Sequence, residues 1–271
     1  MATIIDQVTL RTGVADWLNR SDLTDAQIDD FVAIGEARIY EELRIPPLEV
    51  VQSFTVTASN SSIIIPLGFI EMIELKLDGG ADKDADIVLS RIDSKTFSNN
   101  KISHAYTRQA GNFLLTNNSG EQDTGGTYVM TYYKSEDSVG TYATATTAVT
   151  AFVVGKYYKI ASLGNTSQSN WNTAAGTSNV TYAVGSIFKA AAVTTGTGTA
   201  YQETIPWILE TEFETILYAA CTVGSTFVGD VEMEQKFNQL TVNKIVALND
   251  KEKRADLKGG IYTHHFSSIS I

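Results

Sequence analysis

Few residues of this 271-residue chain have the types and spacing that catalysis requires. Histidine, the side chain best suited to acid–base work near neutral pH, occurs only at positions 104, 264 and 265. The sequence contains neither a Gly-x-Ser-x-Gly nucleophile turn nor a Gly-x-x-x-x-Gly-Lys phosphate loop. We therefore expect no enzymatic activity and no cofactor.

Three alternating carboxylates, Asp82, Asp84 and Asp86, match the start of an EF-hand calcium loop. That loop also needs glycine at its sixth position and glutamate at its twelfth, where this chain has Ile87 and Asp93. The three aspartates are better explained as the solvated tip of a hairpin.

His264 and His265 are also weak metal ligands, because adjacent imidazoles point apart in an extended chain and no third ligand is nearby. The single Cys221 falls on the apolar face of a predicted helix without an obvious base, so we expect a small buried hydrophobe. The sequence predicts no metal site.

The elements begin with a pair of helices. Apolar residues repeat at helical spacing from Leu10 to Leu18, and again from Ile28 to Ile39. Thr24 is an expected N-cap of the second helix, because Gln27 three residues later completes a capping box. Pro46-Pro47 ends that helix.

After Pro47 the apolar period changes from helical to alternating, which is typical of strands. Asp78-Gly79-Gly80 is a strong turn signal between two of them. The segment 91–99 is predicted to form one helical turn or irregular chain. The expected strands are 50–57, 63–65, 69–77, 87–89, 104–106, 112–116 and 127–133.

Composition changes abruptly between Thr141 and Ala200, where the chain has three lysines and no acidic residue. Short β-prone pieces alternate there with glycine and asparagine turns, and aromatic residues recur at regular intervals. We expect a small β-sandwich or barrel inserted into the host fold. Helices return at Pro206, expected as a first helical residue, with one apolar stripe from Leu209 to Phe227. After Gly229 a second helix carries Met233, Phe237, Leu240, Ala247 and Leu248 on its apolar face.

The sequence thus predicts an α+β fold: a helical bundle from N- and C-terminal helix pairs, a small antiparallel β domain and an inserted β-sandwich or barrel-like module. The expected boundaries are 1–48 and 203–258 for the helix pairs, 49–139 for the β domain, 140–202 for the module and 259–271 for a docking tail.

Within these elements the chain resembles a known family. The segments concerned are VADWLNRSDLTDAQIDDFVAIGEARIYEELRIPPLE, IIIPLGFIEMIELKL, NFLLTNN with TYVMTYYKSED, and IPWILETEFETILYAACTVGSTFVGD. They are similar to bacteriophage head-to-tail adaptors, the head-completion proteins that sit under the portal. The module departs from the plain adaptor pattern, and its GKYYKIASLGNTSQSNW segment resembles a β module found within several phage structural proteins.

The resemblance implies a structural virion protein of the neck or tail, assembled in the host cytoplasm into a ring that is commonly of twelve copies. The implied partners are the portal protein, a tail tube or nozzle protein, further copies of the chain, and tail fibres through the module. DNA would pass through the channel of the ring without specific binding, and no membrane is involved.

The net charge of −11 agrees with a channel that repels phosphates, since binding nucleic acid needs clustered lysines and arginines. The candidate channel-lining residues are Asp29, Asp30, Glu36, Glu210, Glu212 and Glu214. The apolar tail is the candidate portal-docking segment, through Ile261, Tyr262, His264, His265, Phe266, Ile269 and Ile271.

Two other functions remain open from the sequence. The aromatic-rich module supports a tail- or fibre-associated module that binds carbohydrate or host. A wall hydrolase is the third class, although no paired acid and base emerges. Assembly separates them, because an adaptor forms rings on the portal, fibre proteins are usually trimers, and hydrolases act alone.

Overall fold

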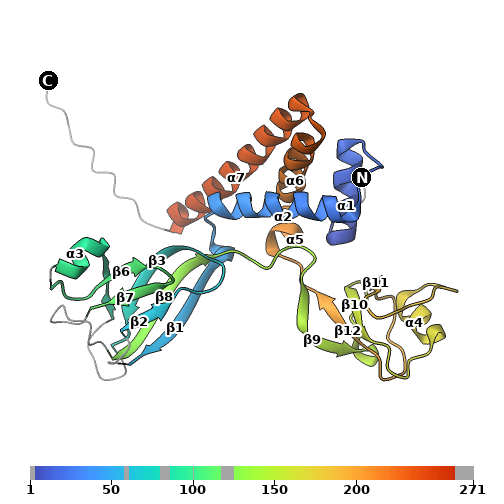
Figure 1. Ribbon diagram of the computed structural model, residues 1–271, viewed down its shortest axis with the longest axis horizontal. Coiled ribbons are helices and arrows are strands. Elements are labelled where there is room, and N and C mark those ends of the chain that lie inside the picture. The colour runs from blue at the N-terminus through green and yellow to red at the C-terminus, as the bar shows by residue number, and fades with distance from the viewer. Residues whose placement is uncertain (1–3, 58–60, 80–85, 100, 117–124, 260–271) are drawn as a thin grey trace. The chain divides into compact units, whose positions relative to one another are not determined.

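The fold is described from a computed structural model, in which residues 4–57, 61–79, 86–99, 101–116 and 125–259 are placed (Figure 1). The chain divides into two compact units. The first contains residues 1–39 and 137–246, and the second contains residues 40–136 and 247–271. Helices and three four-stranded sheets in the described residues confirm the α+β fold.

The N-terminal helix pair forms as the sequence predicts. Helix α1 spans Gln7–Leu18 and helix α2 spans Asp25–Glu42. The expected capping box opens α2: the Gln27 amide donates to Thr24 Oγ1 at 3.3 Å, and the Thr24 amide donates to Gln27 Oε1 at 2.9 Å. A short 3-10 turn, η1 (Pro46–Leu48), follows the helix at the two prolines.

The C-terminal helices are α5 (Trp207–Thr211), α6 (Phe213–Val228) and α7 (Val231–Gly259). The expectation of one continuous helix from Pro206 was wrong, because Glu212 has non-helical backbone angles (φ −137°, ψ 44°) and separates α5 from α6. Pro206 is the N-cap of α5 rather than its first residue. Gly229 ends α6 with φ +78°, which glycine adopts without strain.

Two positions of the predicted apolar stripes were also wrong. Phe227 is 58% exposed, because it lies in the last turn of α6, although its ring contacts that of Phe31. Ala247 of α7 is exposed. The buried positions of α7 in the first unit are Phe237, Thr241 and Ile245, which follow each other at the four-residue spacing of one helix face.

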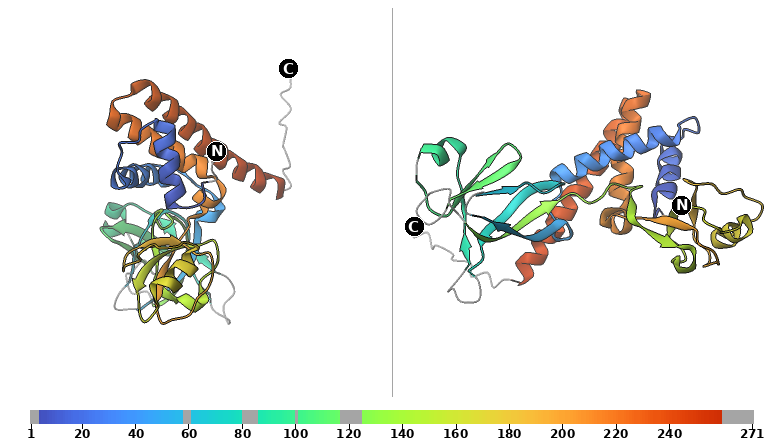
Figure 2. Two further views of the ribbon diagram at one scale, coloured as in Figure 1. Left: turned by 90° about the vertical axis from the view of Figure 1, so that its right-hand side faces the viewer. Right: turned by 60° about the horizontal axis from the view of Figure 1, so that its bottom comes forward.

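The two helix pairs pack together around α6 (Figures 1 and 2), as expected for a bundle. Helix α2 crosses α6 at Gly35, where an added Cβ would lie 3.0 Å from backbone atoms of Ala219 and Ala220. Trp17 of α1 and Phe237 of α7 both contact the ring of Tyr218. Burial on several sides makes α6 the centre of this core.

The second unit contains two sheets. One has the order β1 (Glu49–Val56), β8 (Gly126–Lys134), β3 (Phe69–Leu77) and β4 (Ile87–Val88), and all of its pairs are antiparallel. The other has the order β2 (Ser62–Ile64), β7 (Asn112–Leu115), β6 (Ala105–Gln109) and β5 (Ser90–Arg91). Helix α3 (Ser94–Asn99) lies between β5 and β6 in the chain.

Alternating inward residues of both sheets share one core that includes Leu75, Phe113, Leu115, Tyr128 and Met130. The predicted strands are present within a few residues of their expected ends. The antiparallel prediction needs one correction, since β5 pairs with β6 in parallel. The connection through α3 returns the chain in the same direction, which a tight hairpin cannot do.

The segment expected as an inserted module, residues 140–202, forms with Glu203 one antiparallel sheet in the order β11 (Ile187–Lys189), β10 (Tyr157–Ser162), β12 (Thr199–Glu203) and β9 (Tyr142–Ala148). Helix α4 (Gln168–Ala175) places Trp171, which is fully buried, against Tyr158, Phe188 and other core residues. The expectation of a sandwich or barrel was therefore wrong: in the described residues, a helix and loops cover the single sheet.

Candidate assembly surfaces

The six acidic residues proposed to line a channel all lie in the first unit, in different environments. Asp29 on α2 accepts hydrogen bonds from Arg11 on α1, at 2.7 Å from Nε and 2.5 Å from Nη2. This bidentate pair raises the pKa of the Arg11 guanidinium, chiefly through its hydrogen bond with Asp29. The charge of Asp29 is therefore largely neutralised within the helix pair.

Glu212 and Glu214 lie at the start of α6 and share one cation. Lys244 Nζ of α7 is 2.5 Å from Glu214 Oε2 and 3.9 Å from Glu212 Oε2. The hydrogen bond with Glu214 raises the pKa of Lys244, which stays protonated. These two carboxylates connect α6 to α7 and offer less free charge than the sequence suggests.

Glu36 is only 2% exposed, and its Oε1 accepts a hydrogen bond from the Val139 amide at 3.0 Å. Its carboxylate therefore lies inside the first unit and does not reach the surface of this chain, because the loop before β9 covers it. Asp30 on α2 and Glu210 on α5 are exposed. Of the six candidates, these two present the most accessible negative charge.

The proposed docking residues of the tail, Ile261, Tyr262, His264, His265, Phe266, Ile269 and Ile271, lie outside the described residues. Helix α7 ends at Gly259, two positions before the first of them.

The structure adds a surface that sequence reasoning missed. Strand β1 is an edge of its sheet, and among the described residues no strand pairs with its outer side. The side chain of Val51 on this strand is exposed (68%). An open edge of eight residues can pair with another chain. Alternation predicts such a strand, but it does not tell an edge strand from a central one.

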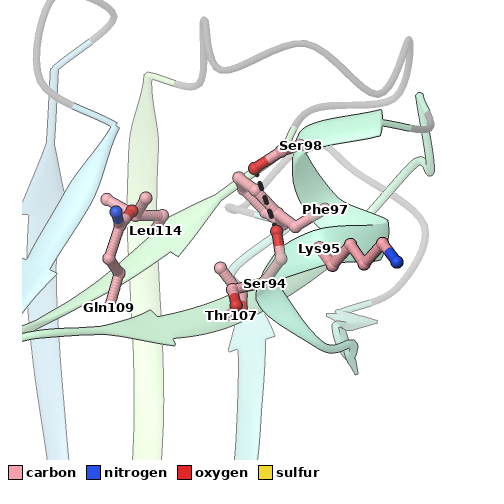
Figure 3. Close-up of a pocket in the computed structure, with 7 residues that line it drawn as sticks. All are labelled: Ser94, Lys95, Phe97, Ser98, Thr107, Gln109 and Leu114. Atoms are coloured by element: carbon pink, nitrogen blue, oxygen red, sulfur yellow. Dashed lines mark hydrogen bonds between the residues drawn. The ribbon is translucent and has the colours of Figure 1, made fainter.

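Two shallow pockets in the described residues are large enough for a small molecule. The first, of about 400 Å³, lies beside α3 and is lined by Phe97, Thr107, Leu114 and several polar side chains (Figure 3). In it, Ser98 Oγ donates to the Ser94 carbonyl, as expected for a helix. Among the described residues that line it, Lys95 is the one charged side chain, and these residues offer no acid–base pair.

The second pocket, of about 510 Å³, lies on the module and is lined mainly by amide and hydroxyl side chains. Two of its amides are already used within the module: Asn172 Nδ2 donates to the Val180 carbonyl, and Gln168 Nε2 donates to the Tyr182 carbonyl. Neither pocket has the convergent reactive groups of an active site.

The other residues that the sequence offered for chemistry, the cysteine and the aspartates, are considered by their burial and ion pairs. Cys221 is fully buried in α6, and burial raises the pKa of its thiol to about 12, so it is unreactive at neutral pH. Asp82 and Asp84 lie outside the described residues, whereas Asp86 pairs with Lys76 at 2.9 Å. No group of three or more potential metal ligands occurs among the residues that are described.

In the described part of the chain, no helix combines the length and apolarity that a membrane span requires. The comparison with curated proteins returns no match. A family model described as SU10 adaptor protein matches residues 8–204. The matched residues include helices α1 (except Gln7) and α2 and all three sheets. This match covers well over half of the chain, and it agrees with the structural rather than catalytic character of the surfaces described above. The chain therefore belongs to the SU10 adaptor protein family of phage structural proteins.

Proposed function

We propose that the chain is a head-to-tail adaptor that assembles into a ring, connects the portal to the tail, and extends the DNA channel. The family match over residues 8–204 carries this proposal, because it includes both the helix pair and the β unit. The partners proposed are the portal protein, a tail tube or nozzle protein, and further copies of the chain. Its place is the neck of the virion, after assembly in the host cytoplasm.

The surfaces of the subunit support an assembling role. Ile34 of α2 is 57% exposed and Val51 of β1 is 68% exposed, although each lies on an element whose other face is packed. Closed rings need two different surface patches that fit each other on neighbouring subunits. Exposed apolar side chains on both units, together with an open strand edge, are suited to such contacts between subunits.

We propose that Asp30 and Glu210 contribute to the acidic lining of the channel. Asp29, Glu212 and Glu214 contribute less, because Arg11 pairs with Asp29 and the single cation of Lys244 is shared by Glu212 and Glu214. Negative charge facing the lumen keeps DNA phosphates from binding, over a distance of about 10 Å in moderate salt. DNA then passes without specific contacts.

We further propose that the tail after Gly259 docks on the portal through its apolar and aromatic residues. Aromatic anchors contribute strongly to protein interfaces. The module has its own buried core around Trp171, and we propose it as an accessory that reaches tail fibres rather than as part of the ring.

Sedimentation velocity with purified portal rings tests the proposal. The protein alone is expected to sediment as a monomer, and addition of portal is expected to give a saturable complex with a fixed number of copies per ring. A variant lacking residues 260–271 should remain folded and bind the portal more weakly. Failure of the full-length protein to bind portal rings at any ratio would contradict the proposed function.

A further inference from the structure

The outer face of the module's sheet carries lysine and tyrosine side chains. Residues that are partners on neighbouring strands form one row across all four strands, which runs Ile187, Lys159, Tyr201 and Thr146. Partner residues of antiparallel strands lie on the same face of a sheet. The residues that alternate with them, such as Phe188 and Ile160, belong to the buried core, so this row faces outward.

Two lysines of this face lie over tyrosine rings. Lys159 Nζ is 5.7 Å from the ring centroid of Tyr142. Lys189 Nζ is 5.6 Å from the ring centroid of Tyr157, its partner across the strands. A ring attracts an ammonium group through its π face but accepts none of the strong hydrogen bonds that the group can donate. Both lysines are exposed, so these donors are available to an anion.

The charge of this face is positive. The segment 141–200 contains three lysines and no acidic residue, and the third lysine, Lys156, is also exposed. Two acids lie near the tyrosines, but Asp6 is only 2% exposed and Glu203 only 3%. The amide of Gln7, the first residue of α1, donates to Glu203 Oε1 at 3.0 Å. The start of α1 therefore covers the acidic end of the face and leaves the lysines open.

The composition of this face favours a saccharide chain over a protein as its partner. Protein interfaces have an apolar centre, whereas the large aliphatic side chain of the row is Ile187 alone, at one edge of the sheet. The row supplies hydroxyl groups from Thr146 and Tyr201 instead. A sugar has C–H groups on the faces of its ring and hydroxyls around it, and tyrosine offers an apolar ring and a hydroxyl to match.

We propose that the face made by Tyr157, Lys159, Lys189 and Tyr201 binds an anionic polysaccharide. The ammonium groups pair with anionic groups of the chain, and the tyrosines contact its sugar rings. Two cations on neighbouring strands suit a polymer, which carries charges at intervals, better than a single small anion. This inference adds a second activity to the chain and does not depend on the proposed function.

Isothermal titration calorimetry of the full chain at low salt tests the proposal with two probes. Polygalacturonate carries carboxylates and dextran sulfate carries sulfates, so the tighter of the two identifies the anion that the face prefers. Binding of at least one is expected, and it should weaken as salt is raised, because exposed ion pairs are screened. Neutral dextran should give no signal.

The double variant Lys159→Gln, Lys189→Gln should bind about fivefold to tenfold more weakly, since two exposed ion pairs are lost. The matched control is Lys95→Gln with Lys236→Gln, which removes the same charge outside the module. Lys236 also lies over an aromatic ring, that of Phe237, at 6.0 Å. The control should bind as the wild type does.

The role of the tyrosine separates sugar recognition from general attraction between charges. Tyr201→Thr keeps a hydroxyl and a strand-forming residue, and it should weaken binding by at least about threefold while both lysines remain. Poly-L-glutamate should bind more weakly than the preferred polysaccharide.

Three results would overturn the proposal: no binding of either polysaccharide at low salt, an equal loss of affinity in the control pair, or equally tight binding of poly-L-glutamate. The last would assign the face to an acidic protein segment. Circular dichroism checks that each variant is folded. If Tyr201→Thr does not fold, the lysine variants and the comparison with poly-L-glutamate decide.

Discussion

Helices α6 and α7 are neighbours joined at Gly229, yet the share of their residues that is buried differs greatly. Nine of the sixteen residues of α6 are buried, including small and polar ones such as Thr215, Gly224 and Ser225. In the part of α7 that belongs to the first unit, only Phe237, Thr241 and Ile245 are buried. One helix is surrounded by others, and the second is covered along a single stripe.

Helical geometry explains this difference. Tyr218 of α6 contacts α7, and Phe227 of α6 contacts α2. The two residues are nine positions apart, which is about 180° around a helix of 3.6 residues per turn. Helices α2 and α7 therefore flank α6 on opposite sides. Helix α6 is therefore the central element of the bundle, while the outer face of α7 is free for solvent or a partner.

The largest expected effect is on the central helix. Leu217→Ala should lower the free energy of unfolding of the bundle by about 3 kcal/mol, because Leu217 is 1% exposed and its loss leaves a cavity. Val246→Ala on α7, where the side chain is 52% exposed, should change it by less than about 0.5 kcal/mol. Urea unfolding followed by circular dichroism at 222 nm measures both. Similar values for the two variants would contradict the central position of α6.

A slightly smaller loss is expected where α2 crosses α6. Gly35→Val should destabilise the bundle by about 2 kcal/mol, since even a Cβ at this position meets the α6 backbone at 3.0 Å. Ala33→Val on the exposed side of the same helix is the matched control for the lower helix propensity of valine. The same urea titration applies, and a Gly35→Val variant no less stable than Ala33→Val would show that the crossing is looser than described.

The thiol of α6 gives a third, chemical test. Cys221 should not react with a thiol reagent in native buffer at pH 8, because it is buried and its pKa is raised to about 12, and should react fully in urea. Cys221→Ser should cost about 1–2 kcal/mol, since a hydroxyl there needs a hydrogen bond more than a thiol does. Rapid labelling of the native protein would mean that α6 opens readily.

The smallest effect is expected at the ion pair that connects α6 to α7. Lys244→Gln should lower stability by less than about 1 kcal/mol, because the lysine side chain is one-third exposed. The loss should shrink further at high salt, which screens the wild-type pair. A loss that is large and independent of salt would show that α7 contributes more to the core than its burial indicates.

Local signals were enough for much of the fold. The capping box of Thr24 and Gln27 fixed the start of α2, and alternation found the strands of the β unit, because both depend on residues close in sequence. Helix α4 was missed, since QSNWNTAA has weak helix formers and no apolar stripe. Its formation depends on Trp171 entering the core of the module, which is a tertiary effect.

The candidate assembly surfaces were harder to predict from the sequence than the fold. Carboxylates are usually at the surface, so Glu36 was expected there and Glu203 was not considered at all. Both are buried by chain segments more than one hundred residues away in sequence: Val139 covers Glu36, and Gln7 covers Glu203. The open edge of β1 was missed for a similar reason, because strand order is set by pairing between distant segments.

Direct imaging of the protein in assembled particles is the sharpest test of the adaptor role. A small tag inserted at the exposed turn between Val184 and Gly185 of the module would mark each copy, since this turn has room for added atoms. Cryo-electron microscopy of tagged particles should show a ring of density at the neck, directly below the portal, with the label at its periphery. Label on the fibres or the tail tip, with none at the neck, would contradict the adaptor role.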